Sequence, residues 1–460
     1  MTKKVSKLRL AELIGSLSYA LDLTEGQPAG HCVRCCWIGM HVGRQLDMDE
    51  DALWALYYTL LLKDLGCSSN AARICELYLT DDRAFKRDFK RVGLGTPQVA
   101  AFVVSRTGKH AGWRQRLGAI LNIMRNGDEV AQELIQTRCS RGANIARQLR
   151  FPESVAEAVH GLDEHFDGSG RPDALTGDAI PLASRIALLA QVVDVFHFNE
   201  GAASALTEAR TRAGSWFDPA LVAALETVAQ QPEFWVMLES EEVERAVQAL
   251  EPQAGAVALD EDYLDAIAAA YGEVVDAKSP FTAGHSARVG YYSDLIAQEL
   301  GVSEDRRRWL RRAALLHDVG KLGVSNMILD KPARLEADEW EAMKLHASYT
   351  EEILGRISAF AELARVSASH HERLDGTGYP NGLAATEIAL ETRIITVADI
   401  FDAITAERPY HPPTPVDRTL EIMRSLVGSA LDADCFAALE RVTSREAQLE
   451  AVGHRAPVAA

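Results

Sequence analysis

The feature that most limits the fold of this chain is an internal duplication, in which the second half of the sequence matches the first. His31-Cys-Val-Arg in the first half matches His285-Ser-Ala-Arg in the second. Each of these histidines is followed 32 residues later by a Leu-Leu-x-Asp-x-Gly segment, which contains Lys63-Asp64 in one copy and His317-Asp318 in the other. Self-similarity of this kind indicates two related folding units.

The correspondence continues toward the end of each copy. Asp167-Gly-Ser-Gly matches Asp375-Gly-Thr-Gly, and an Arg-Ile pair stands 18 residues after each of these aspartates. Most other segments show helical periodicity, as in residues 51–63, and alternation typical of strands is scarce. We therefore predict an all-α protein with two tandem helical domains. A small-residue stretch after Glu251 gives domains at 1–250 and 255–445, followed by a C-terminal tail at 446–460.

Composition narrows the class of protein. A chain of 460 residues with 47% hydrophobic and 25% charged residues is typical of soluble globular proteins. No apolar run is long enough to span a membrane, and the basic start lacks a signal-peptide core, so we expect a cytoplasmic protein. The net charge of −18 argues against polymeric nucleic acid as a partner. A small anionic nucleotide would have to be attracted by metal ions and a few local cations.

The seven cysteines suggest reduced thiols, because the number is odd and no secretory context is evident. Cys32, Cys35 and Cys36 lie close to His31 and have some features of a zinc cluster. The second pair of ligands that a closed structural site needs is missing. Buried helical thiols are therefore the favoured interpretation.

The two copies differ in the residues that could bind metal. The segment 312–323 reads as an apolar helix carrying His317, Asp318 and Lys321. Other imidazoles and carboxylates occur on similar apolar segments, and together these residue types are ligands for divalent transition metals. The second copy has His285, His317, Asp318, His346, His370, His371 and Asp399, and at the positions of His317, His346, His370, His371 and Asp399 the first has Lys63, Arg138, Leu162, Asp163 and Gln191. Because lysine, arginine and leucine cannot hold a divalent cation, we predict that metal binding and catalysis reside in the second copy.

The first copy also contains an insertion. Seventy-one residues separate Cys67 from Arg138, whereas 25 separate the matching Lys321 and His346. The insertion includes the basic stretch 83–91, for which a solvated helix face is favoured over a partner-binding surface.

The motifs of the second copy resemble those of the HD-GYP family of cyclic di-GMP phosphodiesterases, a branch of the HD superfamily. The resemblance covers about residues 260–440 and rests on His285, the His317-Asp318-Val-Gly-Lys321 segment, His346, the segment from His370-His371 to Gly378-Tyr379-Pro380, Asp399 and Arg408-Pro-Tyr. It implies a metal-dependent enzyme of bacterial second-messenger signalling that hydrolyses cyclic di-GMP to pGpG, with further cleavage to GMP left open.

The resemblance also implies the role of each site residue. Asp318 would bridge two divalent metal ions, iron or manganese, with His285, His317 and Asp399 on one ion and His346, His370 and His371 on the other. Asp318 and Lys321 would be catalytic, Lys321 and Arg408 would contact the substrate phosphates, and Tyr379 would shape the site. Phe281 replaces a glutamate that binds a third metal in some members, so two metals are expected. His411 replaces a basic residue that contacts phosphate.

The expected chemistry has a physical basis. Two metals about 3.5–4 Å apart clamp a phosphodiester and lower the pKa of a shared water. Adjacent helical residues diverge by about 100°, so His370 and His371 can share one ion only where their helix ends. The Asp-Gly-Thr-Gly-Tyr-Pro segment that follows supplies such an end. Packing is the alternative role for Tyr379.

Two alternative functions stay open at this stage. One is hydrolysis of another cyclic dinucleotide or nucleotide, and the other is a non-catalytic signalling or binding module. The first copy keeps its helical pattern although its ligands are lost. We therefore expect it to be a structural and regulatory partner, which packs on the active copy, forms a homodimer interface or binds signalling proteins.

Overall fold

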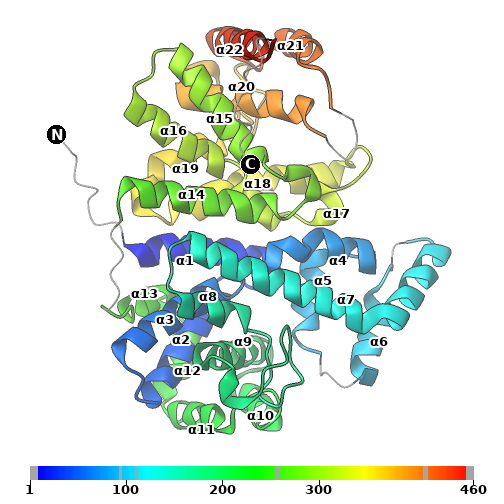
Figure 1. The fold of residues 1–460 in the computed structure, drawn as a ribbon, viewed down its shortest axis with the longest axis vertical. Helices are drawn as coiled ribbons and strands as arrows, with labels where there is room; N and C mark the ends of the chain where they lie inside the picture. The colour runs from blue at the N-terminus through cyan, green and yellow to red at the C-terminus, as the bar shows by residue number, and fades with distance from the viewer. Residues whose placement is uncertain (1–8, 93–95, 110, 254–258, 408–412, 452–460) are drawn as a thin grey trace. The chain divides into compact units, whose positions relative to one another are not determined.

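The computed structural model describes residues 9–92, 96–109, 111–253, 259–407 and 413–451. All regular secondary structure in these residues is helical, which confirms the predicted all-α class (Figure 1). Within the same residues, no helix is both long and apolar enough to cross a membrane.

The chain divides into two compact units, Met1–Tyr263 and Leu264–Ala460. The division falls in the first turn of α14, shortly after the small-residue stretch where the sequence placed it. The first unit contains α1 (Leu10–Glu25), α2 (His31–Gln45), α3 (Glu50–Leu62), η1 (Cys67–Asn70), α4 (Ala71–Tyr78), α5 (Asp82–Phe89), α6 (Thr96–Arg106), α7 (Trp113–Gln148), α8 (Glu153–His160), η2 (Gly177–Ala179), α9 (Leu182–Glu200), α10 (Ala202–Thr211), α11 (Pro219–Val228), α12 (Pro232–Leu238) and α13 (Val243–Ala249).

The second unit contains α14 (Glu261–Asp276), η3 (Pro280–Thr282), α15 (His285–Glu299), α16 (Glu304–Leu316), η4 (Val319–Gly323), α17 (Asn326–Leu329), α18 (Ala337–Gly355), η5 (Ser358–Phe360), α19 (Ala361–Ala368), η6 (Ala385–Glu387), α20 (Leu390–Thr405), α21 (Val416–Arg424) and α22 (Ala433–Ala451). Helix α22 continues to Ala451, so the segment expected as a tail from residue 446 begins as part of this helix.

The two units repeat the same packing. In the second unit α15 packs against α16, α20 and α22, and α18 packs against α19 and η4. In the first unit α2 packs against α3, α9 and α11, and α7 packs against α8 and η1. Each partner in one unit corresponds in sequence to its counterpart in the other, so the duplication extends to the fold.

Two glycines in each unit allow the local geometry of the site. Gly284 and Gly30 have φ angles of 69° and 83°, which favour glycine, and the histidine that begins α15 or α2 follows directly. A Cβ atom at Gly320 would collide with the backbone oxygen of His346, and one at Gly66 would collide with that of Arg138. Because Gly320 and Gly66 have no side chain, η4 can approach α18 closely, and the segment before η1 can approach α7 in the same way.

Candidate metal centre

The expected ligands lie in helices of the second unit or directly beside the helix ends, and the fold brings them together. His285 is the first residue of α15, His346 lies in α18 and Asp399 lies in α20. His317 directly follows α16, and Asp318 directly precedes η4. The sequence placed His317, Asp318 and Lys321 in one continuous helix, and that prediction is wrong: α16 ends at Leu316, and Lys321 lies in the η4 turn.

The histidine doublet also lies beyond a helix. Helix α19 ends at Ala368, and Ser369 separates it from His370 and His371. The helix was expected to end at the Asp-Gly-Thr-Gly-Tyr-Pro segment after the doublet, and it ends earlier, so that both histidines lie outside it. Both side chains can point toward His346, whose ring centroid lies 5.4 Å from that of His370 and 4.9 Å from that of His371.

The imidazoles of the site are oriented through their Nδ1 atoms. His317, His346 and His370 each hold a backbone carbonyl oxygen through Nδ1, at 2.6, 2.6 and 2.7 Å. Nδ1 therefore carries a proton in each ring, and each Nε2 faces the centre. The Nε2 atoms of His346 and His370 lie 3.4 Å apart.

Asp318 lies at the middle of this arrangement. Its Oδ2 is 3.3 Å from Nε2 of His285 and 3.2 Å from Nε2 of His317. Its Oδ1 is 3.6 Å from Nε2 of both His346 and His370. The two oxygens thus face two separate groups of histidines, as a bridging carboxylate would.

The donor set fits bound metal. Nε2 of His317 and Oδ1 of Asp318 are buried and have no hydrogen-bond partner among the described residues. Such atoms are costly unless they bind a ligand. Five groups of potential ligands among the described residues meet the spacing of a metal site. Two of them match the two sets expected from the sequence: His285, His317 and Asp399, and His346, His370 and His371. One more in the second unit joins His317, Asp318 and His370, and the other two lie in the first unit: His31, Cys35 and Asp194, and Glu25, Asp64 and Cys67.

The protonation states of Asp318, His346 and His370 suit metal ligands. Burial acts to lower the pKa of His285, but Asp318 and Asp402 outweigh it and raise that pKa to about 9, so that this imidazole must release a proton to bind metal. Burial lowers the pKa of His346 to about 4 and, with the charge of His317, that of His370 to about 3. Burial acts to raise the pKa of Asp318, but His317 and Lys321 outweigh it and hold that pKa well below its usual value. The carboxylate is therefore ionised and both imidazoles are neutral at pH 7, as metal binding requires.

Lys321 and Tyr379 lie at the edge of this centre. The Lys321 ammonium donates to Oδ2 of Asp318, and its side chain stays partly exposed. The Tyr379 ring stacks on His371, with centroids 4.7 Å apart. The loop that carries Tyr379 is held by Glu372, whose carboxylate accepts from the backbone N–H groups of Asn381 and Leu383 at 2.7 and 2.9 Å. Arg408 and His411 lie outside the described residues.

Three residues near the site were given no role in the sequence. Asp402 lies 2.6 Å from Nδ1 of His285, and Arg288 donates to Asp402. The matching residues of the first unit repeat this contact, with His31 2.6 Å from Asp194, so the duplication was the signal that could have identified it. Trp340 of α18 is 45% exposed, and its ring lies 6.0 Å from that of Tyr379.

The equivalent place in the first unit holds an ammonium group. Lys63 contacts Nε2 of His31 at 3.1 Å and Oε1 of Gln191 at 3.0 Å, and it also donates to Asp64. Burial acts to lower the pKa of Lys63, but Asp64 outweighs it and raises that pKa well above its usual value. A permanent cation therefore occupies the position where a metal would bind.

The basic stretch 83–91 contributes two more cations to this site. Lys86 and Lys90 lie 3.4 and 3.0 Å from the buried carboxylate of Glu25. The prediction of a solvated helix face is therefore wrong for these two lysines, whereas Arg87 on the other side of α5 is exposed. Cys32, Cys35 and Cys36 are fully buried, as predicted for helical thiols.

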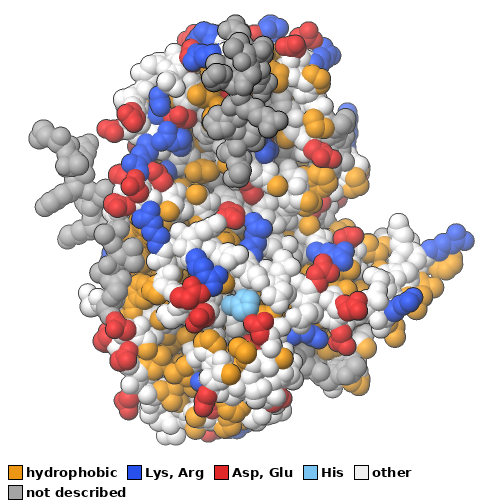
Figure 2. Space-filling view, in the orientation of Figure 1, with side chains coloured by type: hydrophobic (Ala, Val, Ile, Leu, Met, Phe, Trp, Pro, Cys, Tyr) orange, Lys and Arg blue, Asp and Glu red, His pale blue; other side chains and the backbone are white. Residues whose placement is uncertain are grey.

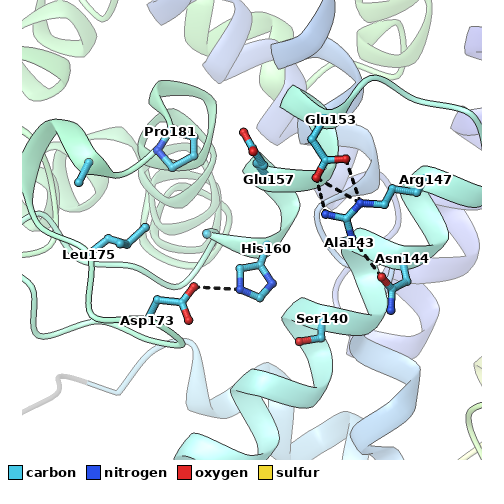
Figure 3. A pocket seen from close by; sticks show the side chains of 12 residues that line it. Ser140, Ala143, Asn144, Arg147, Glu153, Glu157, His160, Asp173, Leu175 and Pro181 are labelled. Atoms are coloured by element: carbon cyan, nitrogen blue, oxygen red, sulfur yellow. Dashed lines mark hydrogen bonds and ion pairs between the residues drawn. The ribbon is translucent and has the colours of Figure 1, made fainter.

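A groove of about 530 Å³ lies elsewhere in the first unit, between α7, α8 and the loop that precedes α9 (Figure 3). His160 and Asp173 face each other across it at 3.0 Å, and Arg147 is paired with Glu153 at its rim. Because these charged groups satisfy one another, the groove offers no group that requires a ligand.

Comparisons with known proteins agree with this geometry. The HD domain family profile matches residues 104–221 and 271–435. The chain is 55% identical to a 3′3′-cGAMP-specific phosphodiesterase of Vibrio cholerae over 94% of each chain. It is 39% identical to the cyclic di-GMP phosphodiesterase response regulator RpfG of Xanthomonas campestris, over 37% of this chain and 45% of that protein.

A solved structure extends the likeness to the whole fold. The crystal structure of a cyclic GMP-AMP specific phosphodiesterase from V. cholerae superposes with a TM-score of 0.66 at 49% identity, covering 95% of this chain and 98% of that one. The chain therefore belongs to the HD domain family, as a tandem protein of the HD-GYP type.

Proposed function

We propose that the second unit is a metal-dependent phosphodiesterase that opens the ring of a cyclic dinucleotide. The observation that carries this proposal is the convergence of four Nε2 atoms on the two oxygens of Asp318. Metal ions bound there would polarise the phosphate and supply a nucleophile from water at neutral pH. His285, His317 and Asp399 would hold one ion, His346, His370 and His371 the other, and Asp318 both.

Other residues of the site would contact the substrate. Lys321 lies against Asp318 with part of its side chain open to solvent, so its ammonium can neutralise charge that develops on the phosphate. The Gly-Tyr-Pro loop forms one wall beside His371. Arg408 and His411 follow α20, and we assign them to the second phosphate on the basis of the sequence motif.

For the substrate we favour 3′3′-cGAMP over cyclic di-GMP. A relative that matches 94% of this chain is named as specific for 3′3′-cGAMP, whereas two relatives named for cyclic di-GMP match 37% and 39% of it. Cyclic di-GMP, which the sequence motif suggested, is the second candidate. The two molecules differ in one purine, so the phosphate chemistry proposed above is the same for both.

A substrate panel tests this proposal. The full chain, loaded with manganese or iron, is incubated with each cyclic dinucleotide, and linear products are separated by chromatography. We expect metal-dependent ring opening with a higher kcat/KM for 3′3′-cGAMP. A higher value for cyclic di-GMP would overturn the substrate assignment alone. Absence of cleavage for every cyclic dinucleotide, with metal bound, would favour a non-catalytic binding module.

A further inference from the structure

The α6–α7 hairpin of the first unit has an apolar surface that the fold of that unit does not use. The hairpin belongs to the insertion that separates Cys67 from Arg138 and that the second unit lacks. Five large hydrophobic side chains within it are exposed, by 42% at Val104, 71% at Trp113, 51% at Leu117, 58% at Leu121 and 68% at Met124. Figure 2 shows hydrophobic side chains at the surface over this hairpin, on the right of the view.

Four of these residues form a continuous stripe along one helix. Trp113, Leu117, Leu121 and Met124, here called the α7 stripe, follow one another at spacings of four, four and three residues. These spacings place them on one face of α7. A different face of α7 is buried, because Ile123 and Val130 are 7% and 6% exposed. The helix is thus apolar on two faces, and only one of them is used within the unit.

The two ends of the α7 stripe carry charges of opposite sign. Arg114 lies at the start of the stripe, and Asp128 lies one turn beyond its end, after the non-helical residue Asn126. The Asp128 side chain is fully exposed, and its one recorded ion pair, to Arg171, is long at 3.5 Å. In an antiparallel pair of these helices centred on Leu121, Arg114 of one copy lies level with Asp128 of the other.

We propose that the α7 stripe is a self-association surface, on which a second copy of this chain packs antiparallel about a two-fold axis at Leu121. A two-fold interface is self-complementary, as this order of charges requires. Each copy contributes a tryptophan near the end of the stripe and leucines at its centre, the residue types that anchor helical interfaces. Both hairpins together would form a four-helix bundle.

The size of the surface fits this role. A large hydrophobic or aromatic side chain buries about 150–250 Å² when fully covered, so five half-exposed ones offer several hundred Å² per copy. Standard interfaces bury about 800 Å² per partner. A membrane surface is disfavoured as the occupant, because Asp128 and Glu129 lie at the end of the stripe and the whole chain has a net charge of −18.

The mass of the full chain in solution, measured by sedimentation, tests the proposal. We expect the wild-type chain to be a dimer at micromolar concentration and Leu121→Arg to raise the dissociation constant by about tenfold or more. The matched control is Val236→Arg, which places the same charge on an exposed residue of α12 and should leave the dimer intact. A monomeric wild-type chain, or equal weakening by both variants, would overturn the proposal.

The antiparallel register is tested by exchanging charges. Arg114→Asp and Asp128→Arg should each weaken the dimer, and the double variant should restore it, because the pair is re-formed with its signs reversed. Failure of the double variant to restore the dimer overturns this register. Sedimentation of the wild-type chain with phosphatidylglycerol vesicles gives the remaining outcome: a monomer that pellets with vesicles, and that loses this binding in Leu121→Arg, would assign the stripe to a membrane instead.

Discussion

Asp318 and Asp64 occupy matching positions in the two units but contact different side chains. Asp318 faces four imidazoles, whereas its counterpart Asp64 faces the ammonium of Lys63. In both cases a buried carboxylate is balanced by positive charge, which burial demands. In the second unit Lys321 supplies part of that charge and the proposed metal ions would supply the rest, whereas in the first unit Lys63 supplies it.

The two residues assigned to catalysis should respond differently to substitution. Asp318→Ala removes a ligand from both metal positions, so metal content and turnover should fall together. Lys321→Ala removes a contact to Asp318 and the proposed phosphate contact but no metal ligand, so metal content should stay near two ions per chain while kcat falls by about 10²–10³-fold. Elemental analysis and steady-state kinetics on the same preparations check both. If Lys321→Ala loses metal as completely as Asp318→Ala, the role of Lys321 is wrong.

Asp402 is expected to position His285 rather than to bind metal itself. Removal of a carboxylate that holds a metal-binding histidine lowers metal affinity by about 10–100-fold. Asp402→Ala should therefore weaken metal binding by this amount in competition with a chelator. Asp194→Ala, which breaks the same contact to His31 in the first unit, is the matched control and should leave metal affinity unchanged. An equal effect of both substitutions would indicate a loss of fold instead.

Lys63 is expected to stabilise the first unit. Lys63→Met leaves Asp64 buried without its nearest cation, and breaking a buried ion pair in this way costs about 3–5 kcal/mol. The free energy of unfolding, measured by urea denaturation, should fall by that amount, while the metal content of the second unit is unchanged. Lys109→Met, at an exposed position of the same unit, should have no measurable effect. Equal stability of the two variants would show that Lys63 is not needed to balance Asp64.

At the scale of helices, the sequence predicted positions better than boundaries. The resemblance to the HD-GYP family, rather than the spacing alone, predicted that His285, His317 and Asp399 meet, and the structure brings them together. The end of α16 at Leu316 was missed, since Arg312 to Gly323 reads as one apolar pattern and only the tight approach of Gly320 to His346 forces the turn. The inward direction of Lys86 and Lys90 was missed because a basic run gives no sign of a buried carboxylate distant in sequence.

Trp340 of α18 lies beside the Gly-Tyr-Pro loop, and its ring centroid is 6.0 Å from that of Tyr379. If a purine of the substrate stacks there, Trp340→Ala should raise KM for a cyclic dinucleotide by the equivalent of about 1–3 kcal/mol and change kcat little. Trp340→Phe should recover most of the loss. Hydrolysis of methyl p-nitrophenyl phosphate, which has no purine, is the control and should be unaffected. A fall in kcat for both substrates would assign Trp340 to holding the loop.

At the scale of the whole molecule, the two units share their internal contacts but differ in the residues that could bind metal. Both units keep the contact between the first histidine and its aspartate, the glycine beneath the site and the glutamate that holds the following loop. Only the second keeps the ligands. A first unit without a task would lose these packing contacts as readily as it lost its ligands. Its retained contacts, its internal cation and its exposed stripe are the reasons why we propose a structural role for it.

Deletion of the first unit tests this role. Residues 255–460 include all of α14 and should bind metal and cleave cyclic dinucleotides, because every described ligand lies within them. Residues 1–250 should do neither, since Lys63 takes the place of the ion. We further expect 255–460 to be monomeric, because it lacks the α7 stripe, and to differ from the full chain in turnover or thermal stability. Sedimentation, kinetics and thermal unfolding on both proteins check this. Stoichiometric metal in 1–250 would place a functional centre in the first unit. The same oligomeric state, rate and stability for 255–460 and the full chain would remove the regulatory role altogether.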